Sequence, residues 1–263
     1  MLCEARAERA APHMHNTFIS QLFHWDNRTP RDWHRPINKL LRLMRLNAQL
    51  GPKSFSWGMA NVEARMNVFH LASQCAAFQV PGDFVEIGCN SGESSVIIQK
   101  VLNLLAPAKQ LHCYDSFEGL PALTGQDAHE GVYDKGHMSA SLFSFHDNFR
   151  KAGVPEPAHI HKGWFEETIP GKLPDRIAFA LLDGDIYTST KHVLPHLYAR
   201  MSPGAVCMFG VYYDHEVYPR PHTIPQYKSP GVKRATDEFF ADKPEKVSVL
   251  YANEYSNGYF RKQ

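Results

Sequence analysis

VPGDFVEIGCNSGESS, residues 80–95, is the stretch of sequence that decides the fold of this chain. Its β-type run 83–87 (DFVEI) predicts a short strand, and residues 94–105 predict the helix that follows. Gly88 and Gly92 flank the turn between them, because glycine tolerates a positive φ and lets backbones approach closely. A strand, a glycine turn and a helix in this order predict the first unit of an α/β sheet.

The same alternation of strands and helices continues along the chain. It predicts a mostly parallel, doubly wound sheet with right-handed crossovers and a ligand site at the carboxyl ends of the strands. The expected strands are 83–87, 110–114, 158–161, 177–182, 204–210, 246–251 and 257–262, and the expected helices are 36–50, 59–79, 94–105, 140–152, 186–200 and 231–241.

Composition excludes several classes of partner. The chain has 263 residues and a formal net charge of +1, which gives no reason to expect nucleic acid or an anionic membrane and fits a small-molecule ligand. No run approaches 18 apolar residues, so no membrane span is expected. The five cysteines are widely spaced without a Cys-x-x-Cys pair, which predicts reduced thiols in a cytoplasmic protein.

The beginning of the chain differs from the rest. Residues 1–15 lack the apolar core of a signal peptide. We expect residues 1–58 to form an arm with a helical extension, and residues 59–263 to form a Rossmann-like domain. The helices expected at 36–50 and 59–79 offer a surface for a homodimer or a higher homo-oligomer.

Two acidic residues stand beside the glycine turn and the second expected strand. The G-x-x-x-G spacing differs from the G-x-G-x-x-G of dinucleotide binders and lacks the Lys-Ser/Thr of a P-loop, which disfavours a dehydrogenase. Glu86 suits the ammonium of an aminoacyl ligand, and the alternative is a glycine turn without a ligand. Asp115 lies 23 residues after Gly92, where an acidic residue usually holds a ribose diol, and the alternative is a helix N-cap.

Two further segments follow expected strands. Trp164 beside Gly163 offers a flat aromatic ring to a purine, unless it packs in the core with Phe165. Asp183 and Asp185 follow the most apolar strand, where a carboxylate can bind a cation, orient a hydroxyl or act as a base. Asp185 could instead cap the next helix.

A Tyr- and Pro-rich segment, residues 212–229, follows the fifth expected strand. A loop of this length is often a lid or a binding loop, and the alternative is a surface loop packed by its own aromatic rings. His215 is a candidate base, although the chain has 15 histidines and a surface histidine is the simpler alternative. The candidate acceptor contacts are Tyr212, Tyr213, Tyr218 and His222.

Taken together, these segments resemble the macrocin O-methyltransferase (TylF-like) family over roughly residues 50–262. The resemblance implies a class I methyltransferase fold, S-adenosylmethionine (SAM) as cofactor, usually Mg²⁺, and O-methylation of a small natural-product intermediate. The matching pieces are VPGDFVEIGCNSGESS (80–95), YDSFEGLP (114–121), GWFEETIP (163–170), LLDGDIYTST (181–190), LYARMSPGA (197–205) and PGVKRATDEFF (230–240).

The resemblance also implies which residues hold SAM. The glycine turn would hold its methionine and ribose parts, Asp115 and Ser116 the ribose, and Phe117 and Trp164 the adenine. The implied cofactor-binding residues are Glu86, Gly88, Cys89, Asn90, Ser91, Gly92, Ser95, Asp115, Ser116, Phe117, Gly163, Trp164, Asp183 and, in a capping segment, Ser56 and Trp57.

One segment departs from the family pattern. Family members typically follow the fifth strand with Asp-Asp-Tyr, whose carboxylates complete a magnesium site, but here the run is Gly210-Val211-Tyr212. Only Asp183 remains as a family ligand, and one carboxylate makes a poor Mg²⁺ site. Either the chain transfers methyl without metal, using a base such as His215 or Asp183, or it binds SAM without methyl transfer, as a partner subunit or in a non-methylating reaction.

Overall fold

Seven strands form one sheet in the described part of the computed structural model, which comprises residues 34–44, 62–123, 125–129, 133–213, 229–252 and 256–263. The strands are β1 (Asp83–Ile87), β2 (Leu111–Asp115), β3 (His159–Lys162), β4 (Ile177–Leu182), β5 (Met201–Phe209), β6 (Ser248–Leu250) and β7 (Asn257–Arg261).

The sheet has the strand order β3-β2-β1-β4-β5-β7-β6. The first five strands in this order are parallel, and β7 runs antiparallel to both β5 and β6. The strand order reverses at β1, whose neighbours are β2 and β4, and parallel α/β sheets bind ligands beside such a reversal. The mostly parallel, doubly wound sheet predicted from the sequence is confirmed.

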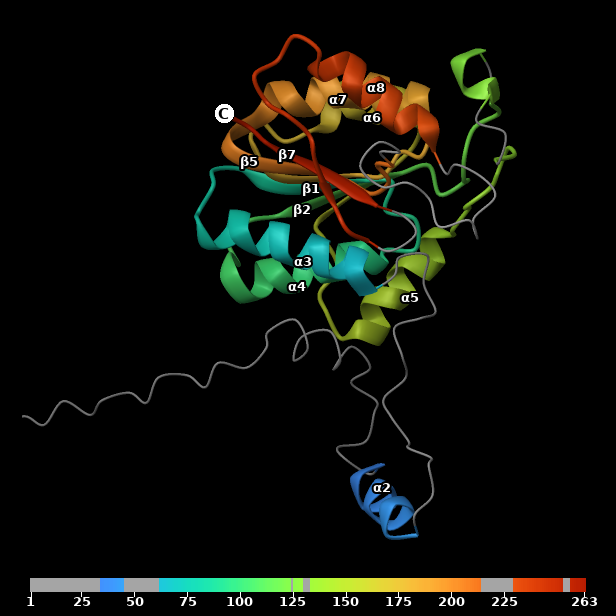
Figure 1. The fold of residues 1–263 in the computed structure, drawn as a ribbon, viewed down its shortest axis with the longest axis vertical. Coiled ribbons are helices and arrows are strands. Elements are labelled where there is room, and N and C mark those ends of the chain that lie inside the picture. Colours follow the sequence, from blue (N-terminus) through green and yellow to red (C-terminus); the bar gives the residue numbers. More distant parts are fainter. Residues whose placement is uncertain (1–33, 45–61, 124, 130–132, 214–228, 253–255) are drawn as a thin grey trace, which may run out of the picture.

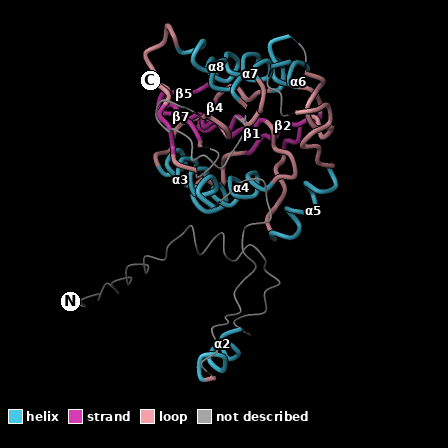
Figure 2. Tube along the Cα trace, turned by 45° about the vertical axis from the view of Figure 1, so that its right-hand side comes forward, coloured by secondary structure: helices cyan, strands magenta, loops and turns pink. Residues whose placement is uncertain are grey.

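Helices cover both faces of the sheet (Figure 1). A second view, in Figure 2, shows the same three layers with the strands in the middle. One face carries α3 (Val62–Ala77), α4 (Glu93–Leu105) and α5 (Leu142–Ala152), and the other carries α6 (Phe165–Lys172), α7 (Tyr187–Arg200) and α8 (Pro230–Phe240).

Two elements depart from the expected ranges. The expected helices do not include residues 165–172, but α6 forms there as a short helix, and its Pro170 and Gly171 interrupt the helical pattern of the sequence. The strand expected at 204–210 begins earlier, at Met201, because β5 shifts register against β4 around its Pro-Gly pair. A 3₁₀ turn, η1 (Gly125–His129), also forms between the expected strand 110–114 and the expected helix 140–152.

The N-terminal predictions are tested only in part. The described helix α2 (His34–Leu43) overlaps the range 36–50 expected for the first helix and begins two residues before it, and residues 45–61 lie outside the described part. Leu40 and Leu43 of α2 are exposed. The oligomer surface and the domain boundary after residue 58 stay predictions. In the described ranges, no helix combines the length and apolar character needed to cross a membrane.

The core lies on both sides of the central strands. All residues of β4 are buried, which explains its continuous apolar run, since a central parallel strand contacts helices on both faces. Phe84 of β1 and Phe179 of β4 are fully buried, with ring centroids 5.5 Å apart. This pair joins the two strands that lead into the predicted ligand site.

Replacing Phe179 with alanine should therefore lower the free energy of unfolding by about 3–5 kcal/mol, because a large cavity forms in the core. Equilibrium urea denaturation measures this change. Phe78→Ala is the matched control: Phe78 is 70% exposed, and we expect a change within about 0.5 kcal/mol. Equal losses in both variants would contradict the assignment of Phe179 to the core.

Candidate cofactor and active site

A cleft of about 350 Å³ opens at the carboxyl ends of β1 to β4. It lies where the strand order reverses, as the sequence predicted for a ligand site. Its lining residues are Gly88, Asn90, Asp115, Ser116, Gly119, Leu120, Pro121, Met138, Gly163, Trp164, Phe165, Glu166, Asp183, Gly184, Asp185 and Ser189.

A smaller cavity of about 90 Å³ adjoins this cleft and reaches toward α3, α4 and β5. The two share Gly88, Asn90 and Asp183, so these residues border both spaces. Asp183 therefore lies where a ligand in the cleft and a second molecule in the smaller cavity would meet. The smaller cavity is also lined by Ala64, Arg65, Val68, Cys89, Glu93, Ser94, Ile97, Leu181, Met208, Gly210 and Asn257.

Asp115 ties the glycine turn to the end of β2. Its carboxylate accepts hydrogen bonds from the backbone N–H groups of Asn90 and Phe117, each at 2.7 Å. Burial raises the pKa of Asp115, and these two hydrogen bonds oppose the rise. Residues 116–123 form no helix, so Asp115 is not the helix N-cap that the sequence left open as an alternative. It presents its carboxylate to the cleft beside Ser116.

Glu86 lies beneath the glycine turn and is fully buried. Its carboxylate accepts hydrogen bonds from the hydroxyls of Ser94 and Ser95 at the start of α4. Burial is the main cause that raises the pKa of Glu86 to about 8, and the charges of Asp183 and Asp115 raise it further. Glu86 thus fastens β1 to α4, and its predicted contact with a ligand ammonium stays a prediction.

Other predicted residues lie away from the two cavities. Phe117 is buried and packs edge-to-face on Phe145 of α5, with ring centroids 5.8 Å apart. Tyr212 is buried and donates a hydrogen bond from its hydroxyl to Asp237 of α8 at 2.7 Å. Ser91, Gly92, Ser95 and Tyr213 also line neither cavity. Ser56, Trp57, His215, Tyr218 and His222 lie outside the described residues.

Sequence reasoning missed several residues that line the cleft. Gly119 and Pro121 belong to the YDSFEGLP run, so their place in the site could have been found. Met138 has no sequence signal, because the fold of the polar loop brings it to Asn90. The Asn90 side-chain amide donates a hydrogen bond to the Met138 carbonyl oxygen at 2.5 Å. Arg65, which forms an ion pair with Glu93 at 2.8 Å, was likewise missed beside the smaller cavity.

Asp183 lies between two glycines. A Cβ atom added to Gly88 would lie 2.1 Å from the backbone oxygen of Asp183, and one added to Gly210 would lie 2.1 Å from its Oδ1 atom. The Asp183 carboxyl group therefore fills the space where a side chain at position 210 would begin. Burial, and to a smaller extent the charge of Asp115, raises the pKa of Asp183 to about 6.

This geometry does not fit the magnesium site that the family resemblance implies. A carboxylate at position 210 would collide with Asp183 in its present rotamer, and Val211 offers no ligand atom. In the described part of the chain, the one group of three metal-ligating side chains near enough to share an ion lies elsewhere, on β2 and β3. Among the described residues, Asp183 belongs to no group of three side chains that lie close enough to share an ion.

The fold is that of the class I methyltransferases. A solved structure titled "Structure of the O-methyltransferase NovP" shares the fold with a TM-score of 0.65 and 23% sequence identity, covering 77% of this chain and 81% of that one. The sequence profile of the macrocin-O-methyltransferase (TylF) family matches residues 5–228. The chain therefore belongs to this family.

Two curated relatives are similar over part of their length. One is 8-demethyl-8-(2,3-dimethoxy-alpha-L-rhamnosyl)-tetracenomycin-C 4'-O-methyltransferase of Streptomyces olivaceus, 32% identical over 59% of this chain and 62% of its own length. Another is mycinamicin III 3''-O-methyltransferase of Micromonospora griseorubida, 28% identical over 59% of this chain and 64% of its own length. The chain thus spans less than two thirds of the length of these relatives.

Replacing Glu86 with glutamine tests the burial of its carboxyl group. A raised pKa means that the folded state holds the proton more tightly than the unfolded state. The stability contributed by this proton is present below the ordinary pKa of 4.5 and is lost as the pH rises to about 8. Glu86→Gln cannot ionise, so its melting temperature should fall less between pH 5 and pH 8 than that of the wild type.

Differential scanning calorimetry of the ligand-free protein measures this difference, which should amount to several degrees. Glu63→Gln is the control, because Glu63 lies partly exposed on α3, and it should keep the wild-type pH dependence. An unchanged pH dependence in Glu86→Gln would show that the carboxyl group does not titrate as proposed.

Proposed function

We propose that this chain is a SAM-dependent methyltransferase that methylates a hydroxyl oxygen of a small natural-product intermediate without a metal ion. The relatives named above are O-methyltransferases acting on a rhamnosyl tetracenomycin and on mycinamicin III. The observation that carries the metal-free part is the fit of the Asp183 carboxyl group against Gly210.

The cleft offers matching groups for each part of SAM. Asp115 and Ser116 would accept the ribose hydroxyls, Trp164 would cover the adenine, and the turn at Gly88 would hold the methionine part. The charges of Asp115 and Asp183 raise the pKa of Glu86, and the charge of Asp115 raises that of Asp183, so a cation placed there would be stabilised. SAM brings two positive charges, its ammonium and its sulfonium.

When bound, SAM would supply a methyl group activated by the sulfonium. Asp183 would accept the proton of the acceptor hydroxyl while the oxygen of that hydroxyl attacks the methyl carbon. S-adenosylhomocysteine would be left as the product and would keep the electron pair of the former C–S bond. In-line alignment of oxygen and methyl contributes most to such a transfer. Because no metal would lower the pKa of the hydroxyl, an acceptor of low pKa, such as a phenol or an enol, suits this site best.

We propose a cytoplasmic location, and the thiols support it. Cys75, Cys89, Cys113 and Cys207, the cysteines of the described part, are all buried and free. Free thiols favour a reducing compartment, so we place the protein in the cytoplasm. The small-molecule acceptor is the partner proposed here, and a homodimer or higher homo-oligomer remains a prediction.

Formation of S-adenosylhomocysteine tests the proposal directly. The purified full chain is incubated with SAM and a panel of phenolic, enolic and glycosidic acceptors, with Mg²⁺ or with EDTA. We expect S-adenosylhomocysteine and methylated acceptor in equal amounts by mass spectrometry, at the same rate in both buffers. Loss of turnover in EDTA that Mg²⁺ restores would overturn the metal-free part. SAM binding without any turnover would favour the alternative of a SAM-binding protein that does not transfer methyl.

The role of Asp183 predicts a pH profile. Since the ionised carboxylate is the base and its pKa is about 6, kcat/KM should rise with pH and level off above that value. Asp183→Asn should lower kcat by about 10²–10⁴-fold and remove this rise. Asp185→Asn is the matched control, because Asp185 lines the same cleft, and it should keep the rise. A rise that survives in Asp183→Asn and disappears in Asp185→Asn would transfer the role to Asp185.

A further inference from the structure

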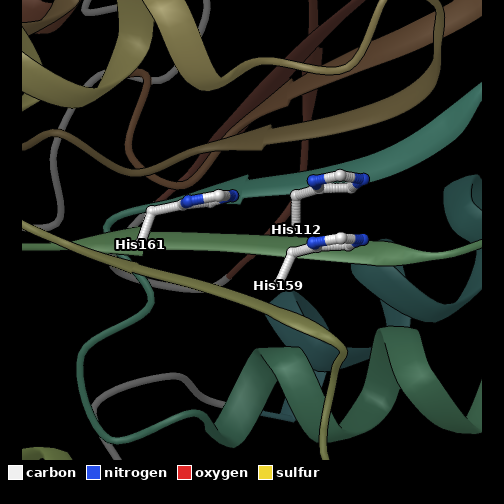
Figure 3. Close-up of side chains that lie close together, drawn as sticks. All are labelled: His112, His159 and His161. Carbon is white, nitrogen blue, oxygen red and sulfur yellow. The ribbon is translucent and has the colours of Figure 1, made fainter.

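Three histidines lie together on β2 and β3, the two strands at one edge of the sheet (Figure 3). His112 belongs to β2 and pairs in register with His159 of β3, and His161 follows two residues later on the same strand. Side chains two residues apart point to the same face of a strand, so all three share one face. Tyr114 lies on this face and donates a hydrogen bond to the Lys172 carbonyl oxygen, which identifies it as the face covered by α6.

The ring nitrogens of these histidines are close enough to share an ion. One nitrogen from each ring lies within 4.8 Å of the other two. The rings of His112 and His159 stack with centroids 4.2 Å apart, and His161 lies about 6 Å from both, in nearly the same plane orientation. None of the three lines the cleft or the smaller cavity, so this group lies outside the candidate active site.

The histidine nitrogens are also unusual in their hydrogen bonding. Both ring nitrogens of His112 and Nε2 of His161 are buried without a hydrogen-bond partner among the described residues. Buried polar atoms in folded proteins almost always have a partner. The nearest carboxylate oxygen of Asp83 lies 3.6 Å from His112 Nε2, too far for a good hydrogen bond. These nitrogens therefore have free lone pairs or N–H groups in a closed space.

We propose that His112, His159 and His161 bind one divalent transition-metal ion, with Zn²⁺ as the reference case. Imidazole nitrogen is a preferred ligand of Zn²⁺, Cu²⁺ and Ni²⁺. Three histidines are enough protein ligands for a zinc site whose fourth position is taken by water. Zn–N distances of about 2.0–2.1 Å place tetrahedral nitrogens about 3.3 Å apart. The rings must approach from their present spacing and tilt out of parallel, by rotation about their side-chain bonds.

The protonation state of the rings agrees with this assignment. Burial lowers the pKa of His112, and burial with the neighbouring histidines lowers that of His161 to about 4. Both rings are thus neutral at pH 7, the form that binds metal. A strongly hydrated cation such as Mg²⁺ is disfavoured, because it prefers oxygen ligands.

The position of the site gives the metal a consequence for the protein. The edge strand β3 has β2 as its neighbour in the sheet, and its end continues directly into Gly163 and Trp164, which line the cleft. An ion held by both strands would link them next to the cleft without touching it. Since it binds the folded state, it would raise the melting temperature with metal concentration.

Zinc binding by the tag-free full chain tests the proposal. After treatment with EDTA and desalting, titration against a Zn²⁺ indicator should give one ion per chain with a Kd of about 1 μM or lower. Loading with Co²⁺ should give the intense visible absorption of a tetrahedral nitrogen site. Zn²⁺ should raise the melting temperature whether or not SAM is present. Absence of stoichiometric Zn²⁺ binding would overturn the proposal.

Substitutions locate the site. Two single variants, His161→Gln and His159→Gln, test the ligands. Each should weaken Zn²⁺ binding at least about tenfold and remove the Co²⁺ spectrum. His196→Gln is the matched control: on α7 it lies 5.4 Å from His192, ring to ring, and this second histidine pair could also attract metal. Binding that is lost in His196→Gln and kept in His159→Gln would overturn the assignment. Melting curves of the metal-free variants show that each folds.

Discussion

Asp183 fits between the ends of β1 and β5 because the neighbouring residue on each side, Gly88 or Gly210, is a glycine. A Cβ atom at Gly88 would collide with the Asp183 backbone, and one at Gly210 would collide with its carboxyl group. Hydrogen bonds from Asp183 N to the Ile87 oxygen and from Gly210 N to the Leu182 oxygen, at 2.8 and 2.9 Å, hold these strand ends together. The shape of the cleft floor depends on this close approach.

The electrostatics of the site follow from the same packing. Glu86, Asp115 and Asp183 lie at the ends of three adjacent strands, and burial raises the pKa of each. The charge of Asp115 raises the pKa of Glu86 and of Asp183 further. Serine hydroxyls and backbone N–H groups relieve part of the cost of ionising Glu86 and Asp115. A cationic ligand would relieve the rest, so this acidic floor suits a sulfonium better than an anionic nucleotide. The loss of carboxylates at positions 210 and 211 limits further negative charge here.

The two proposed binding functions use opposite chemistry in neighbouring parts of the sheet. The cleft at the carboxyl ends of the strands presents carboxylates and a tryptophan, whereas the edge made by β2 and β3 presents imidazole rings. Their common element is the chain that runs from His161 through Lys162 to Gly163 and Trp164. A metal ion bound to His161 at the edge of the sheet would hold this segment in place and would favour a fixed position for the ring of Trp164.

Sequence by itself determined the order and type of most strands and helices, since apolar periodicity and glycine turns act locally. It also determined that Asp115, Trp164 and Asp183 would meet, because strand ends in a parallel sheet lie along one edge. It could not show that Gly210 makes room for Asp183, that Phe117 packs on Phe145, or that Met138 reaches Asn90. Nor did it bring His112 to His159 and His161, since these pairings depend on strand register and loop path, which long-range packing decides.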